Sequence, residues 1–146
     1  MKRILLSLLL AAMPLLAACA AGSSAQGGGA VNEADLLNRR FVLSKVNGEP
    51  FVSQERTPEL QFNPDMRVSG QLCNRFTGVG RLDKGTLTVP QMASTMMLCA
   101  DQRLNELEQD VTAMLREGAA LRMENGALLL SRDSAVFEYA PGGAAR

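Results

Sequence analysis

The fold of this chain is decided by the stretch Gly70-Gln71-Leu72-Cys73-Asn74-Arg75-Phe76-Thr77-Gly78. The two terminal glycines suit bulges or turns in a tightly bent sheet, because a residue without a side chain allows strong bending and close approach. Asn74 can satisfy backbone groups in an irregular loop. Phe76 is expected to be buried next to the sulfur of Cys73. We therefore interpret Gly70, Asn74, Phe76 and Gly78 as residues that build the fold.

Short segments of alternating apolar and polar residues lie on both sides of this stretch, a pattern typical of β-strands. Before it, strands are predicted at 40–46, 59–62 and 66–72, separated by turns such as Asn47-Gly48. After it, strands are predicted at 86–89, 121–124, 127–131 and 135–139. About seven or eight short strands joined by tight turns favour a small barrel-like antiparallel sheet.

A single helix is predicted at about 101–117. Its apolar residues recur at helical spacing and are Leu104, Leu107, Val111, Met114 and Leu115. Asp101 is the expected N-cap, Gly118 ends the helix, and the carboxylates Glu106, Glu108 and Asp110 are expected on a solvated face. The predicted fold class is α+β, a small antiparallel barrel-like β-sheet with one amphipathic α-helix.

The N-terminus predicts export and lipid attachment. Lys2 and Arg3 precede an apolar run at 4–16, which is shorter than the roughly 20 residues that span a bilayer. The run ends in Leu16-Ala17-Ala18-Cys19, which resembles the bacterial lipobox. We therefore expect a lipoprotein signal peptide at 1–18 and a lipid on Cys19. A plain signal peptide, with Cys19 as a bystander, is the alternative.

The lipid is expected to hold the protein at the outer membrane, facing the periplasm. Ala20 follows Cys19, where resemblance to Gram-negative lipoproteins permits sorting to that membrane. Residues 19–35 are expected to form the lipidated Cys and a flexible tether, 36–141 the folded domain, and 142–146 a disordered tail.

Composition excludes several classes of partner and cofactor. Lys plus Arg and Asp plus Glu each number 15, so the basic surplus of a nucleic-acid-binding protein is missing. Removal of Lys2 and Arg3 with the signal peptide leaves a slightly acidic chain, which the acyl chains alone must hold at the membrane. We expect no cofactor, no metal and no nucleic acid, and we expect a monomer.

The sequence offers no catalytic constellation. It contains no His, so a Ser-His-Asp triad is impossible, and Ser94 and Thr95 have no base beside them. The glycines at 27–29 are not followed by the Lys and Ser or Thr of a phosphate-binding loop. We therefore expect a protein that is not an enzyme.

Cys73 and Cys99 remain as an even pair once Cys19 carries lipid. An oxidising compartment favours a structural disulfide between them. A catalytic thiol–disulfide function is the alternative, although the spacing is unlike Cys-x-x-Cys. A second alternative is a soft-metal site that binds Cu(I), with ligands Met92, Met96, Met97 and Cys99.

Two motifs resemble the signatures of the META-domain family. The stretch 70–78 resembles its G-x-x-C-N-x-[FY]-x-G signature. Thr95-Met96-Met97-Leu98-Cys99 resembles its second signature, T-x-x-x-C, which lies ahead of the family's helix. The similarity covers about residues 36 to 140, and it places Thr95 among the residues that we interpret as structural.

The resemblance implies a cracked β-barrel and a non-enzymatic protein associated with heat-shock induction and novobiocin tolerance. The leading hypothesis is a stress-associated outer-membrane lipoprotein that acts as a small binding module for an envelope protein. The alternative is a carrier or sensor of an apolar ligand, such as an acyl chain, held inside the barrel. Its candidate lining residues are Phe62, Leu72, Leu87, Leu107 and Met114. A thiol-redox or copper protein is a distant third.

Overall fold

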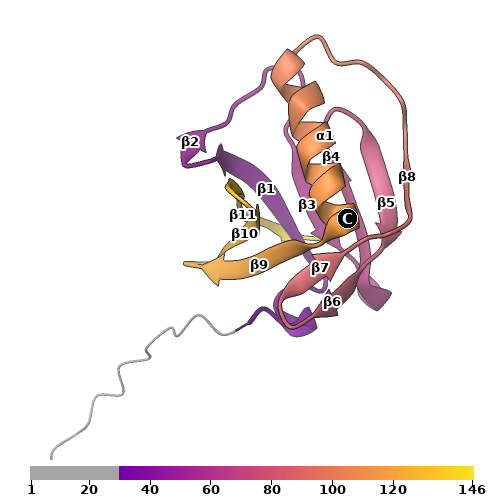
Figure 1. Cartoon of the computed structure of the whole chain (residues 1–146), viewed down its shortest axis with the longest axis vertical. Coiled ribbons are helices and arrows are strands. Elements are labelled where there is room, and N and C mark those ends of the chain that lie inside the picture. The colour runs from indigo at the N-terminus through magenta and orange to yellow at the C-terminus, as the bar shows by residue number, and fades with distance from the viewer. Residues whose placement is uncertain (1–29) are drawn as a thin grey trace, which may run out of the picture.

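The computed structural model describes residues 30–146 and shows one curled antiparallel sheet with a long helix packed against it (Figure 1). The sheet path runs β6-β7-β9-β10-β11-β1-β3-β4-β5-β8, and β2 pairs with β1 outside it. The elements are η1 (Glu33–Asp35), β1 (Arg39–Val46), β2 (Glu49–Pro50), β3 (Glu59–Phe62), η2 (Pro64–Met66), β4 (Arg67–Gln71), β5 (Arg75–Val79), β6 (Arg81–Asp83), β7 (Thr86–Thr88), β8 (Met92–Ser94), α1 (Gln102–Glu117), β9 (Ala119–Glu124), β10 (Ala127–Arg132) and β11 (Ala135–Ala144).

The predicted α+β class is confirmed, with more strands than the alternation indicated. The strands that were not predicted are β5, which lies partly in the stretch 70–78, and β2, β6 and β8, which are only two or three residues long. Such short pairings carry no alternation that a sequence pattern could reveal. None of the helices among residues 30–146 has the length and apolar character to cross a bilayer.

The sheet curls because the continuous stretch from β5 to β6 joins its two ends: β5 lies near one end of the strand order and β6 at the other. β5 pairs with β4, and the chain then passes through Gly80 into β6, which pairs with β7. The Gly80 N–H still donates to the Met66 carbonyl at 2.8 Å, so the bend interrupts no backbone pairing there. A Cβ on Gly80 would lie 2.8 Å from Val68 Cγ2. Only glycine therefore allows this approach, which rolls the sheet into a half-barrel.

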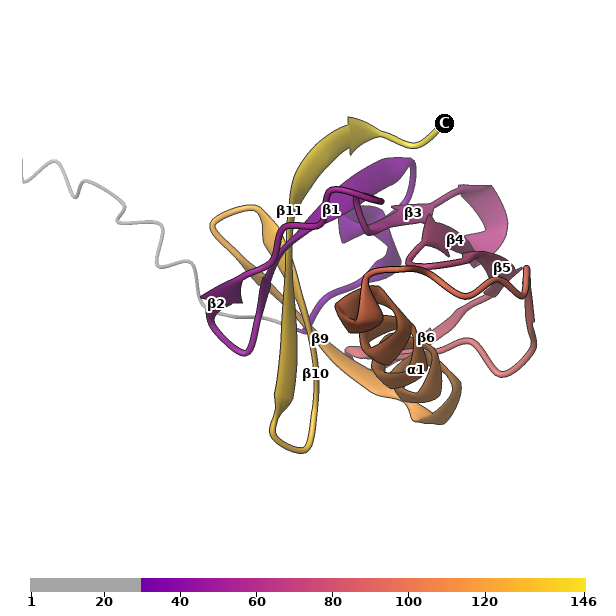
Figure 2. The same ribbon diagram turned by 90° about the horizontal axis from the view of Figure 1, so that it is seen from above.

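The helix forms as its pattern predicts. Asp101 caps it by accepting a hydrogen bond from the Arg103 backbone N–H at 3.1 Å. Gly118, with φ of 120°, ends it. The apolar face is buried against the sheet through Leu104, Leu107, Val111, Met114 and Leu115. The helix thus fills the open side of the half-barrel (Figure 2).

The predicted tether is wrong at its C-terminal end. Val31 is only 4% exposed and belongs to the core. Asn32 caps η1 through a capping box with Asp35. These local hydrogen bonds order a stretch that the small-residue composition assigned to the tether. The predicted signal peptide at 1–18, lipidated Cys19 and the rest of the tether lie outside the described residues.

The predicted disordered tail at 142–146 is also wrong. β11 continues to Ala144, which pairs with Arg39, while Gly143 pairs with Arg40. The Arg40 guanidinium donates to the Gly142 carbonyl at 2.6 Å. Backbone pairing needs no particular side chain, so the glycine-rich composition gave no sign that these residues continue β11 and pair with the first residues of β1.

Candidate functional site

The two motifs meet around the buried side chain of Asn74. Its Nδ2 donates to the Met97 carbonyl at 3.0 Å and to Glu108 Oε1 at 2.9 Å. Its Oδ1 accepts from the Met97 N–H at 2.7 Å and from Thr95 Oγ1 at 3.0 Å. Three of these four bonds join the Asn74 amide to the segment after β8, and the fourth joins it to α1. Asn74 therefore links three parts of the chain, and the structural interpretation of Asn74 and Thr95 fits this geometry.

Glu108 corrects the expectation of a fully solvated helix face. Its Oε2 also accepts from the Asn74 backbone N–H at 2.5 Å, and the residue is half-buried. The carboxylate lies at the border of the apolar face of α1, where the loop from β4 to β5 covers it. The sequence pattern could not show this contact, because the two partners are 34 positions apart.

A disulfide joins the same two motifs. Cys73 and Cys99 are bonded, with their Cα atoms 5.8 Å apart and 26 positions between them in sequence. Asn105 of α1 holds the Cys99 backbone on both sides, donating to its carbonyl at 2.9 Å and accepting from its N–H at 3.0 Å. The predicted disulfide is confirmed.

The disulfide bears on both cysteine alternatives. The two residues are 1% and 5% exposed, so the accessible bond that a thiol-exchange function needs is not present. The Cys99 sulfur is bonded to Cys73 and offers no thiolate to a metal, so the copper site with Met92, Met96, Met97 and Cys99 is wrong as stated.

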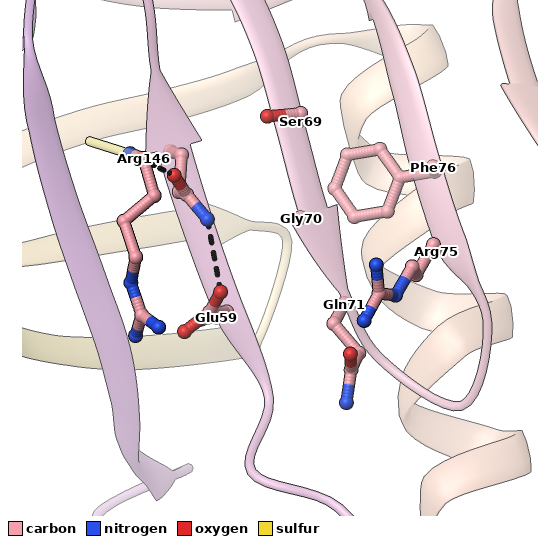
Figure 3. Close-up of a pocket in the computed structure, with 8 residues that line it drawn as sticks. Glu59, Ser69, Gly70, Gln71, Arg75, Phe76 and Arg146 are labelled. Atoms are coloured by element: carbon pink, nitrogen blue, oxygen red, sulfur yellow. Dashed lines mark hydrogen bonds between the residues drawn. The ribbon is translucent and has the colours of Figure 1, made fainter.

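Gly70 and Gly78 permit close approach, and the prediction of bulges or turns at these positions is wrong. Both lie in a regular ladder between β4 and β5. A Cβ on Gly70 would collide with the Glu59 carbonyl and lie 2.8 Å from Phe76 Cε1, because the Phe76 ring covers this glycine (Figure 3). A Cβ on Gly78 would lie 2.6 Å from the Gln91 carbonyl. Phe76 is buried, as predicted, at 4% exposure.

The apolar residues of the second motif are displayed on the surface. Met96, Met97 and Leu98 are 96%, 56% and 86% exposed. We call these three residues the Met96–Leu98 loop. Asn74 holds its middle residue, Met97, through two hydrogen bonds, and the disulfide holds the residue that follows it, Cys99. A large apolar group held outward on a fixed support is typical of an interaction surface.

Two hollows flank the segment that carries this loop. The first, of about 680 Å³, lies between the segment and α1 and is lined by Asn74, Met92, Ser94, Thr95, the Met96–Leu98 loop, Glu108, Thr112 and Arg116. The second, of about 570 Å³, lies towards β5 and is lined by Arg67, Thr77, Gly78, Val79, Pro90, Gln91, Met92, Ala93 and Arg116. Met92 and Arg116 line both, so the hollows adjoin on either side of β8.

A third hollow, of about 330 Å³, is polar and lies on the outer face of β3, β4 and β5 (Figure 3). Gln61 connects its parts by donating to Glu59 Oε1 at 2.9 Å and accepting from the Arg146 N–H at 2.8 Å. Arg40 neutralises Glu59 at 2.8 Å. These contacts fasten the C-terminal residues to the sheet.

The five residues expected to line an internal cavity are placed together in one continuous core cluster. Phe62, Leu72 and Leu87 are fully buried, and Leu107 and Met114 are 3% and 4% exposed. None of them lines the three hollows above. In the described part of the chain they contribute packing.

Three ionisable side chains among residues 30–146 have shifted pKa values, and two of them, Asp101 and Arg103, shift because they bond to each other. The hydrogen bond from the Arg103 guanidinium holds the pKa of Asp101 below its usual range. Burial raises the pKa of the Tyr139 hydroxyl, which is fully enclosed and has no hydrogen-bond partner among residues 30–146. All three groups belong to the scaffold and are not part of the exposed loop.

Comparisons with known proteins agree with the motifs. Residues 34–141 match the META domain. The chain is 41% identical to the heat shock protein HslJ of Escherichia coli K12 over 110 residues. This aligned region covers 75% of this chain and 79% of HslJ. A solved NMR structure is 40% identical, with a TM-score of 0.69 over 75% of this chain and 94% of the other. An NMR structure from Burkholderia xenovorans shares the fold at 18% identity, with a TM-score of 0.60 over 97% and 99% of the two chains.

Proposed function

The chain belongs to the META-domain family and is a stress-related protein, and from this premise we propose that it acts by binding another envelope protein and catalyses no reaction. The Met96–Leu98 loop carries the proposal. Three neighbouring apolar side chains stand in solvent, whereas the other large apolar residues exposed among residues 30–146, Val52 and Val79, occur singly in the sequence. Such exposure is unfavourable by roughly 25 cal/mol per Å² unless a partner covers the surface.

The signature residues support a binding role over a catalytic one. Asn74, Thr95, Glu108 and the disulfide are all engaged in holding the loop in place. A surface that is ordered before binding loses less conformational entropy when a partner docks. Methionine adds adaptability, because its flexible side chain fits partners of differing shape.

The proposed anchor is a lipid on Cys19, which would hold the protein at the outer membrane on its periplasmic side. The described chain begins at the lower left of Figure 1, whereas the segment from β8 to α1 rises at the upper right. A domain hung by its first residues can therefore present the loop away from the anchor. A change in the contact between this loop and its envelope partner would then alter tolerance of novobiocin.

The test is site-specific photo-crosslinking in cells that express the full chain under heat stress. A photoreactive residue at Leu98 is compared with one at Ala120, an exposed position on β9 far from the loop. We expect a discrete crosslinked protein from Leu98 and none from Ala120. Equal crosslinking patterns at the two positions would refute the proposed surface. Cys19→Ala should release the protein from the membrane fraction, and retention of this variant would refute the anchor.

A further inference from the structure

One side of β8 has no strand beside it in the described part of the chain. β8 stands at the end of the strand order, where it pairs only with β5. The Thr95 N–H donates to the Arg75 carbonyl at 3.0 Å, so Thr95 and Ala93 direct their backbone groups towards β5. Because this direction alternates along an antiparallel strand, the N–H and C=O groups of Met92 and Ser94 point away from the sheet.

β8 is short, at three residues, but its free edge has neither a charged side chain nor a covering element from residues 30–146. Natural edges are commonly blocked by charged side chains or by a helix or loop laid over them. Met92, Ala93 and Ser94 carry no charge, and the two adjoining hollows leave space on both sides of them. An added strand would continue alongside the Met96–Leu98 loop, which supplies apolar surface beyond the end of β8.

Positive charge adjoins the other end of the edge. Arg67 and Arg116 line the hollows beside Met92, and both are exposed. Neither forms an ion pair with a carboxylate of residues 30–146. The one carboxylate that lines the same hollows, that of Glu108, is occupied by Asn74. The site therefore complements a ligand that brings its own negative charge.

Resting on the proposed binding function, we propose that β8 takes an extended segment of another polypeptide as an added antiparallel strand. Its apolar side chains lie against Met92 and the Met96–Leu98 loop, and its carboxylates lie beside Arg67 and Arg116. A second copy of this chain fits less well. An antiparallel β8–β8 pair would bring the arginines of one copy to residues 94–98 of the other, which include no carboxylate.

The probe is a short fluorescent peptide in which Val and Leu alternate with Ser and whose last two residues are Asp, titrated with the full chain in mild detergent. We expect binding by fluorescence anisotropy, and weaker binding when Lys replaces both Asp residues. Peptides with N-methyl groups on alternate residues, in the two possible registers, test strand pairing. One register should bind about tenfold or more weakly and the other nearly normally. Equal effects in both registers would overturn the proposal.

Protein variants provide a second, independent readout. Arg67→Glu with Arg116→Glu should weaken binding of the Asp peptide about fivefold or more and favour the Lys peptide, whereas Arg81→Glu on β6 is the matched control. Ser94→Pro removes one outward N–H and leaves the bonds to β5 in place, so it should weaken binding without lowering thermal stability. Unchanged binding in the double arginine variant would overturn the assigned charge pattern.

Two outcomes separate this inference from the proposed function. Crosslinks from Leu98 in cells, together with peptide binding that ignores N-methylation, would overturn strand addition and leave the binding module standing. No crosslinks and no peptide binding would overturn both. Concentration-dependent dimers in sedimentation that Ser94→Pro abolishes would overturn the peptide as occupant, because a second copy would then fill the edge.

Discussion

Replacement of Asn74 by alanine should detach the Met96–Leu98 loop from the fold. The substitution removes four side-chain hydrogen bonds, two involving Met97 and one each involving Thr95 and Glu108. Each such bond contributes a net 0.5–1.5 kcal/mol, or about 4 kcal/mol together if all four were shielded from water. Thr95 and Met97 are exposed and regain water, so we expect the free energy of unfolding to fall by about 2–3 kcal/mol.

Urea unfolding of the Asn74→Ala variant measures this loss, and hydrogen exchange at the Met97 amide measures loop detachment. Asn63→Ala is the control, because Asn63 makes only a 3.4 Å side-chain bond to Ser69 and should cost less than about 0.5 kcal/mol. The amide of Met97 should lose its protection in Asn74→Ala alone. A loss below about 1 kcal/mol with Met97 still protected would show that the disulfide, and not Asn74, holds the loop.

Three further predictions concern the scaffold. Cys73→Ala with Cys99→Ala should lower the unfolding free energy by about 3.5 kcal/mol for the 26-position loop, and reductant should have no effect on this variant's urea midpoint; reductant sensitivity would contradict the assigned pairing. Tyr139→Phe should raise stability by about 1 kcal/mol or more by removing a buried hydroxyl without a partner, and a loss in thermal unfolding would mean that the hydroxyl is satisfied. Because the pKa of Asp101 is lowered in the folded protein, its carboxylate stabilises the fold at pH values above the unfolded-state pKa of 3.8, and this contribution is lost as the pH falls through the folded-state pKa. Asp101→Asn should therefore reduce the fall of the urea midpoint at acid pH. An unchanged pH dependence in this variant would exclude Asp101 as the source.

Local patterns predicted the helix and most strands correctly. The apolar spacing from Leu104 to Leu115, the Asp101 cap and Gly118 each act within a few positions, so the sequence displays them directly. The same holds for the strand that ends at Asn47-Gly48, where the predicted turn forms. The order in which the strands pair depends on segments that are far apart in the sequence, so these local patterns could not predict it.

Most of the errors share a physical cause, which is that long-range partners override local composition, whereas the error at the tether comes from the local capping box at Asn32. Gly142 and Gly143 look like a tail until β1 pairs with them. Glu108 looks solvated until Asn74 donates to it. The Met96–Leu98 loop resembles core sequence, and its exposure follows from hydrogen bonds and a disulfide formed with residues more than twenty positions away. The family motifs contain the residues that hold the loop, which are Asn74 and the two cysteines, but nothing in the composition indicated that Met96–Leu98 is exposed.

The pairing of β1 with β11 makes one step of folding depend on segments that are far apart in the chain. The ladder that joins Arg39 to Ala144 closes only when two segments about a hundred positions apart meet, as the 102 positions between Arg40 and Gly142 show. Until then the apolar side chains of Phe41 and Leu43 lack one flank of their final environment. Such non-local closure is slow relative to helix formation, and incomplete chains expose apolar surface and unpaired strand edges. A chain without a paired β11 would therefore be prone to aggregation, and closure of the β1–β11 ladder is the folding step that removes this exposed surface.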